Sequence, residues 1–235
     1  MSVTTAPPPV QKKKSGLGCL GCGCLVVALL ALLFFGLLGG VGYYGYHKIL
    51  GLTSATPADI PSFTASDDVY NAAQQKIAAF DHDVKNHQAA TIQLSADEIN
   101  ALVGHNPDVV KNNIRSFVSF TSNEGRVQAT FPTDKLSDGF IKDRYFNFDT
   151  SFQLGFDSQT KRVIVTPDAL KFGNRVLLGP GAAGTSFNQS FMNSFTPSFN
   201  QSFNDGLRKN PDIAAMLDQA KTIEIKDGEL VIETQ

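Results

Sequence analysis

The residues best suited to metal or redox chemistry are three cysteines near the N-terminus. Cys19, Cys22 and Cys24 are spaced C-x2-C-x-C, and the chain has no other cysteine. A structural zinc site needs four converging ligands, and the first histidine, His47, follows only after a long apolar stretch. The sequence therefore predicts no metal or cofactor here. Small residues at a membrane interface are the favoured interpretation, and acylation of a cysteine is the alternative.

A second group of metal-ligating residues lies near residue 85. His82 and His87 stand beside Asp81 and Asp83. On a helix, Asp83 and His87 share a face because they are four residues apart, whereas His82 points elsewhere. Too few ligands converge for a metal site, so the pattern favours a solvated helix end.

A glycine motif could indicate a nucleotide-binding site. Gly179, Gly181 and Gly184 match G-x-G-x-x-G, and Asp205 lies 21 residues beyond the last glycine. A dinucleotide site also needs a surrounding series of strands and helices in βαβ order, which this region lacks. A P-loop would need a lysine that is absent. We therefore interpret the glycines as a flexible connection and predict no nucleotide cofactor.

The most unusual pattern is a Ser-Phe pair that recurs every four residues. At about 100° per residue, five such rings cover roughly 160° of a helix surface. Two roles follow: the rings cover the apolar face of a sheet, or they line a groove for an acyl chain. Pro197 either kinks this helix or starts a second one. The candidate lipid-binding residues are Phe187, Phe191, Phe195, Phe199 and Phe203.

Local catalytic motifs are missing from the sequence. There is no G-x-S-x-G, no H-E-x-x-H and no carboxylate pair that pattern alone singles out. The sequence thus predicts a protein that is not an enzyme and has no catalytic residue. An exported hydrolase with a site assembled from distant residues is kept as an alternative.

These residues are organised around an apolar stretch. Thirty-three consecutive residues, 15–47, carry no Lys, Arg, Asp or Glu, and their apolar part is long enough as a helix to cross a bilayer core of about 30 Å. We predict a disordered cytoplasmic tail at 1–15 and a transmembrane helix at 16–47. Lys12, Lys13 and Lys14 precede the span, so the N-terminus is expected in the cytoplasm and the rest outside.

The span is favoured as a retained signal anchor of the cell membrane over a cleaved signal peptide, because it is longer than a signal-peptide core and no clean A-x-A site follows. Gly36 and Gly40 form a small-xxx-small pair that permits weak helix dimerisation. After residue 53 the chain has 22 acidic residues against 16 lysines and arginines, a formal charge of −6. Nucleic acid requires a basic surface, so it is excluded as a partner.

The part beyond the span has the patterns of an α+β domain. Residues 48–63 contain prolines and predict a linker, and residues 64–235 predict one domain that folds by itself. Apolar residues recur with helical spacing from Val69 to Val84, and Ser95 with Glu98 predicts a capping box. Alternating residues predict hairpins at 114–131, 146–172 and 223–232. We expect an antiparallel meander sheet with helices packed on one face.

A resemblance follows from these elements taken in order. The N-terminal span, Leu94-Ser-Ala-Asp-Glu-Ile-Asn-Ala-Leu-Val103, the long strands, and the closing Ile223-Glu-Ile-Lys-Asp-Gly-Glu-Leu-Val-Ile232 resemble small membrane-anchored extracytoplasmic bacterial proteins of unknown function. Some of those are grouped with tubular lipid-binding folds. The resemblance implies no catalytic residues. The leading hypothesis is a non-enzymatic envelope interaction or scaffold protein, and a lipid-handling module or an exported hydrolase are the alternatives.

Overall fold

The computed structural model describes residues 52–63, 66–136, 141–180 and 185–235, without the side chains of 135, 136 and 185–192. The predicted tail and transmembrane helix lie outside these residues, as do Cys19, Cys22, Cys24, Gly36 and Gly40. In the described ranges, no helix is both long and apolar enough to span a membrane.

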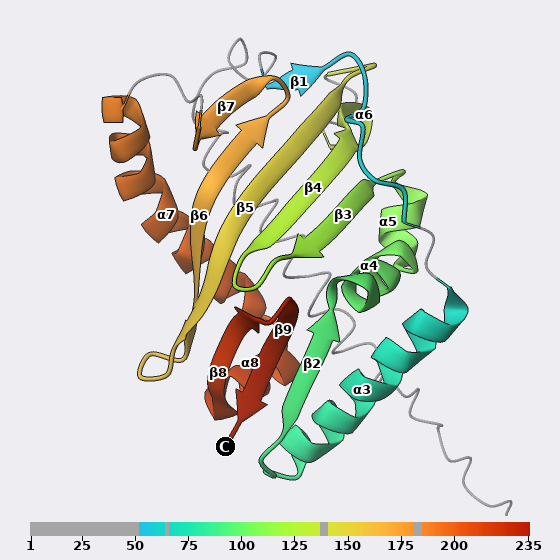
Figure 1. Ribbon diagram of the computed structural model, residues 1–235, viewed down its shortest axis with the longest axis vertical. Coiled ribbons are helices and arrows are strands. Elements are labelled where there is room, and N and C mark those ends of the chain that lie inside the picture. The colour runs from blue at the N-terminus through green and yellow to red at the C-terminus, as the bar shows by residue number, and fades with distance from the viewer. Residues whose placement is uncertain (1–51, 64–65, 137–140, 181–184) are drawn as a thin grey trace, which may run out of the picture.

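Two antiparallel sheets form the framework of an α+β fold (Figure 1). The large sheet has the order β3-β4-β5-β6-β7, and β1 pairs with the start of β5. The small sheet has the order β2-β9-β8. The strands of the large sheet are β1 (Thr53–Ser54), β3 (Arg115–Phe120), β4 (Gly125–Pro132), β5 (Tyr145–Asp157), β6 (Arg162–Phe172) and β7 (Arg175–Leu178). Those of the small sheet are β2 (Thr91–Ser95), β8 (Ala220–Lys226) and β9 (Glu229–Thr234).

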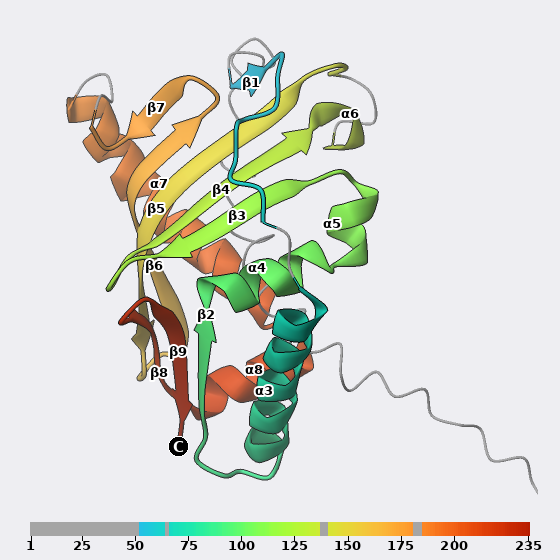
Figure 2. The same cartoon turned by 45° about the vertical axis from the view of Figure 1, so that its right-hand side comes forward.

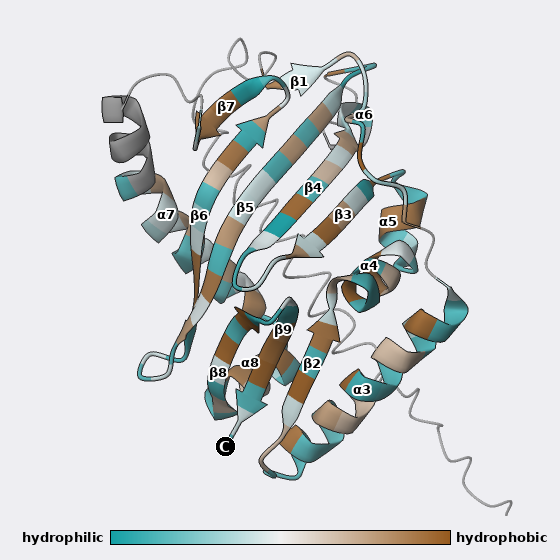
Figure 3. Cartoon of the chain, viewed as in Figure 1, coloured by the Kyte–Doolittle hydropathy of each residue, from teal (hydrophilic) through white to brown (hydrophobic). Residues whose placement is uncertain are grey.

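The three predicted hairpins are confirmed as β3–β4, β5–β6 and β8–β9. Their alternation of residues sets the register, because successive side chains of a strand point to opposite faces. Along β5, Phe146, Phe148 and Phe152 are buried, while polar residues lie between them. Figure 3 shows the same alternation as bands of contrasting hydropathy along β4 and β5.

The predicted helix over 69–84 is confirmed as α3 (Asp67–Lys85), and the predicted capping box is confirmed at the start of α4 (Ala96–Gly104). The Ser66 side chain accepts a hydrogen bond from the Val69 amide at the start of α3. The Ser95 hydroxyl accepts from the Glu98 amide, while the Glu98 carboxylate accepts from the Ser95 amide, which completes the capping box. Lys76 of α3 lies 2.7 Å from the same carboxylate and thereby joins α3 to α4. The remaining helices are α5 (Pro107–Lys111), α6 (Thr133–Leu136), α7 (Thr185–Leu207) and α8 (Pro211–Gln219).

The helices are distributed over both sheets. In both views α7 lies behind the large sheet, and α3 and α8 lie beside the small sheet (Figures 1 and 2). Helix α4 packs against β3, and β8 packs against β5, so one continuous core joins the two sheets.

The division into two sheets differs from the single sheet that the sequence predicts. The C-terminal hairpin pairs through β9 with β2, which includes Thr91 opposite Glu233. The alternation in a strand fixes which face is buried but carries no information about its partner. The meander therefore stops at β7, and β2, β9 and β8 form their own sheet.

Residues 52–63 also differ from prediction, because they pack on the domain instead of forming a linker. Leu52, Thr53 and Ile60 are buried, and β1 pairs with Tyr145 and Phe146 of β5. The segment after β1, residues 55–63, is here named the strap. It crosses the face of the large sheet opposite α7, in front of β4 and β3 (Figures 1 and 2).

The strap is joined to the sheet mainly through one asparagine. The Asn147 side-chain carbonyl accepts from the Ala58 amide at 2.9 Å, and its NH2 group donates to the Thr56 carbonyl at 3.0 Å. The Thr130 hydroxyl also donates to the Asn147 carbonyl, at 2.6 Å. Arg115 adds a hydrogen bond to the Ile60 carbonyl.

The strap predicts where a stable fragment must begin. A fragment 64–235 loses the burial of Leu52 and Ile60, at roughly 1.5 to 3 kcal/mol for each side chain. We expect it to be about 3 to 5 kcal/mol less stable to urea than a fragment 52–235, which is the matched control. Equal free energies of unfolding for the two fragments would show that residues 52–63 do not contribute to the stability of the domain.

Candidate functional site

The phenylalanine repeat places three rings in the core. Phe195, Phe199 and Phe203 are 9%, 4% and 0% exposed. Their rings stack along α7 with centroids 5.7 and 5.8 Å apart. The helix is continuous through Pro197, so the proline does not start a second helix. These three rings cover the apolar side of the large sheet, as expected for the packing role.

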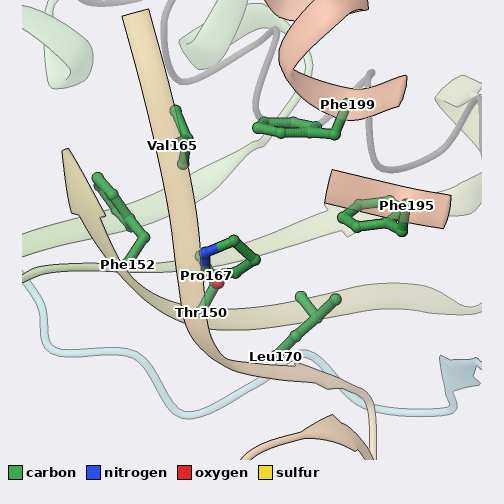
Figure 4. Close-up of a pocket in the computed structure, with 7 residues that line it drawn as sticks. All are labelled: Thr150, Phe152, Val165, Pro167, Leu170, Phe195 and Phe199. Carbon is green, nitrogen blue, oxygen red and sulfur yellow. The ribbon is translucent and has the colours of Figure 1, made fainter. Parts of the chain in front are cut away.

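The space left under these rings is small. Figure 4 shows Phe195 and Phe199 of α7 facing Val165, Pro167 and Leu170 of β6, with Thr150 and Phe152 of β5 beyond. The cavity between them measures about 10 Å³, roughly the volume that one water molecule requires. An acyl chain does not fit in it. The side chains of Phe187 and Phe191 lie outside the described residues, so lipid binding by the repeat stays a prediction.

The residues after Phe199 and Phe203 reveal a second structural role of α7 that the sequence analysis missed. The side-chain carbonyl of Asn204 accepts a hydrogen bond from the Val163 backbone amide at 2.8 Å. The side-chain NH2 group of Asn204 donates to the Val163 backbone carbonyl, also at 2.8 Å. Asn200 makes the same pair of bonds with Val165, at 2.7 and 3.0 Å. Helix α7 therefore closes the free edge of β6 with two side chains that act like a neighbouring strand.

The spacing of these bonds follows from helix and strand geometry. Four residues of a helix rise about 6.0 Å, and two residues of a strand rise about 6.6 Å. Asn200 and Asn204 consequently stay in step with Val165 and Val163. Pro167 is the next residue of β6 with its backbone toward α7, and proline has no N–H to satisfy. Asparagines at i and i+4 beside a phenylalanine stripe are the sequence signal for such a closure.

The opposite edge of the sheet is closed in the same way. Asn100 of α4 accepts from the Val118 amide at 2.8 Å and donates to the Val118 carbonyl at 2.7 Å. Asn100 and Asn204 are both almost fully buried. The edge of β3 at Val118 and the part of β6 that β7 does not cover are thus protected from pairing with another chain.

The histidines described by the structure lie apart from one another. His82 forms a 3.2 Å contact with Asp83 at the exposed end of α3. His105 stacks on Tyr70 with centroids 4.2 Å apart and lies 3.3 Å from Asp67. Among the described residues no group of three or more potential ligands can hold a metal ion.

Gly179 is the one glycine of the motif that the structure describes, and its backbone conformation explains why a glycine stands there. Gly179 has φ +97°, and a Cβ there would lie 3.0 Å from the Cβ of Ala169. Strand β7 pairs antiparallel with β6, so this part of the motif is not in a parallel βαβ unit. Gly181 and Gly184 lie outside the described residues.

One carboxyl group has the raised pKa that general acid catalysis uses. Partial burial raises the pKa of Asp168, and the negative charge of Glu124 raises it further, against a hydrogen bond with Gln153 that lowers it. Asp168 is nevertheless solvent-exposed on β6. A raised pKa without a cleft supports no assigned reaction, and the hydrolase alternative stays a prediction.

The strap face carries concave surface lined by polar residues. Two hollows flank Pro57 of the strap, with volumes of about 420 and 310 Å³. Arg115, Arg144 and Tyr145 contribute to the larger one, and Asp149 and Lys171 contribute to the smaller. Arg126 forms a two-bond ion pair with Asp149 across this face, at 2.9 and 2.7 Å. Since α7 and α4 seal the other side, we take this face as the candidate binding surface.

Comparison with known proteins does not add a family to this description. No family model matches the chain, and the search of curated proteins found no match.

The edge closure predicts a large stability effect at one asparagine. In Asn204→Leu the Val163 N–H and C=O groups stay buried without partners, and each such group costs roughly 1 to 3 kcal/mol. We expect urea denaturation to show a loss of about 2 to 5 kcal/mol. Asn193→Leu, on the exposed side of the same helix, is the control, with a change below about 0.5 kcal/mol. Equal effects of the two substitutions would exclude the closure.

The two roles of the phenylalanine repeat predict different outcomes along α7. Because Phe203 is fully buried, Phe203→Ala should cost about 3 to 5 kcal/mol of unfolding free energy. If the N-terminal rings line a lipid groove, Phe187→Ala and Phe191→Ala should weaken binding of a fluorescent fatty acid while the melting temperature is kept. A Phe203→Ala protein as stable as the parent would refute the packing role.

Proposed function

We propose that this chain is a single-pass membrane protein whose folded domain lies outside the cytoplasm and binds or scaffolds envelope components without catalysing a reaction. The apolar stretch 16–47 supplies the anchor, and the three lysines before it supply the orientation. The domain carries a formal charge of −6 after residue 53, which suits neither nucleic acid nor a strongly anionic partner.

The observation that carries this proposal is that the chain pairs with the large sheet at Thr53, shortly after the predicted anchor in the sequence. Thr53 is buried and pairs with Phe146 of β5, and Arg144 donates a 2.8 Å hydrogen bond to the Thr53 carbonyl. Only five residues lie between His47 and Thr53, so the six steps of chain span at most about 21 Å when extended. The β1 end of the domain is therefore held close to the membrane.

A domain held this way is a fixed platform. A longer flexible linker would let the domain move far from the membrane, whereas pairing of β1 so soon after the proposed anchor keeps the domain near the bilayer surface. The strap face then presents the same polar surface to neighbouring envelope components, and fixed presentation reduces the entropy lost on binding. This is the property that an interaction or scaffold protein requires.

The topology is testable because all cysteines precede residue 25. In a background with Cys19, Cys22 and Cys24 changed to Ser, we expect Asn174→Cys to react with a membrane-impermeant maleimide in intact cells. Thr5→Cys is the matched control and should react only after the cytoplasmic membrane is permeabilised. The reverse labelling pattern would overturn the proposed orientation.

A further inference from the structure

The smaller hollow on the strap face has the organisation of a ligand site. It measures about 310 Å³ and is formed by the strap, β4, β5, β6 and the turn after β6. That volume falls at the lower end of the roughly 300 to 1,000 Å³ that small-molecule sites occupy. Its walls come from segments more than 100 residues apart in the sequence, so they meet only in the folded domain.

The walls are held in place before any ligand arrives. Asn147 uses its side-chain carbonyl and NH2 groups to hold the strap. The Gly173 amide donates to the Asn147 backbone carbonyl at 2.7 Å. Gly173 has φ +54°, and a Cβ there would lie 3.3 Å from the Leu52 carbonyl oxygen. The strap, β5 and the turn after β6 therefore form one connected unit. Such a unit favours ligand binding because little conformational entropy of the protein is lost when the ligand binds.

Four polar side chains face this hollow with hydrogen-bonding capacity to spare. Within the described part of the chain, Asp59, Gln128, Lys171 and Asn174 make no side-chain hydrogen bond or ion pair with the protein. The amides both donate and accept, Lys171 only donates and Asp59 only accepts. Asp149 lies beside them and already accepts two hydrogen bonds from Arg126. The hollow thus offers donors and acceptors together, which is the combination that hydroxyl groups need.

The charges at the hollow compensate one another. Of the residues that line it, Lys171 is positive and Asp59 and Asp149 are negative. The charge of Asp149 is paired with Arg126, which lies outside the lining. A phosphate or nucleic-acid site would show excess positive charge, and a hard-cation site would be built from oxygen ligands without an ammonium group. A neutral ligand with many hydroxyl groups fits this balance.

We propose that this hollow binds a neutral saccharide unit of an envelope glycan, with Gln128, Lys171 and Asn174 bonding to its hydroxyl groups. The biological source of the glycan rests on the extracytoplasmic location proposed above, whereas the chemistry of the hollow does not. Binding of this kind gives the membrane-proximal platform a partner of defined class.

The test uses the full chain in detergent micelles. Chitotetraose, cellotetraose and maltotetraose are titrated separately, and binding is followed by saturation-transfer difference NMR and isothermal titration calorimetry. We expect at least one to bind, and we expect the double variant Gln128→Ala/Lys171→Ala to weaken it about tenfold or more, since each lost hydrogen bond is worth roughly 0.5 to 1.5 kcal/mol. Lys171 is exposed, and Gln128 is half-buried but makes no side-chain hydrogen bond within the described part of the chain, so the melting temperature should be kept.

Lys221→Ala is the matched control, because Lys221 is an exposed lysine on β8 that does not line the hollow. It should leave the affinity unchanged. Failure of all three oligosaccharides to bind, binding that is indifferent to the double variant, or preferential binding of inositol hexakisphosphate would each overturn the proposal. Because this assay does not depend on membrane orientation, its failure is distinguishable from a reversed maleimide labelling pattern.

Discussion

The free edges of the large sheet impose the constraint on which the rest of the domain depends. An exposed edge strand offers unpaired N–H and C=O groups to any other chain, and burying those groups unpaired costs free energy. Here Asn204 and Asn200 satisfy the edge of β6, and Asn100 satisfies that of β3. These hydrogen bonds fix α7 at the edge of β6 and α4 at the edge of β3.

This closure gives the last two repeats of α7 a second role beside core packing. Neighbouring positions on a helix are about 100° apart, so a phenylalanine that faces the sheet places the next residue toward the edge strand. Phe199 and Phe203 pack inward, while Asn200 and Asn204 bond to β6. One stretch of sequence thus serves two surfaces, and the core beneath it retains a cavity of only about 10 Å³.

Closure of one side leaves the opposite face of the sheet for recognition. The strap crosses that face, and Asn147 holds it through groups that a sheet would otherwise present to solvent. The segment that follows the proposed membrane anchor therefore also forms walls of the polar hollow. If the proposed anchor and binding site are correct, attachment and recognition share this segment.

The sequence by itself determined the local features of this domain. Alternation along 146–156 predicted the buried face of β5, Ser95 with Glu98 predicted the start of α4, and the Asp227-Gly228 turn predicted the β8–β9 hairpin. Each depends on residues close in the chain. The burial of Phe203 also follows from a periodic pattern, although the surface it packs against does not.

Only the tertiary structure decided the pairing of β2 with β9, the seating of the strap and the edge bonds of the asparagines. Residues 55–63 contain prolines and have the composition of a linker. Their sequence does not predict the hydrogen bonds to Asn147, which lies about 90 residues later in the chain. Asn204 likewise looks like an ordinary polar residue until β6 lies beside it. A hydrogen bond between distant segments forms only where the fold brings the two groups together. The local sequence pattern does not determine the positions of those groups in the fold.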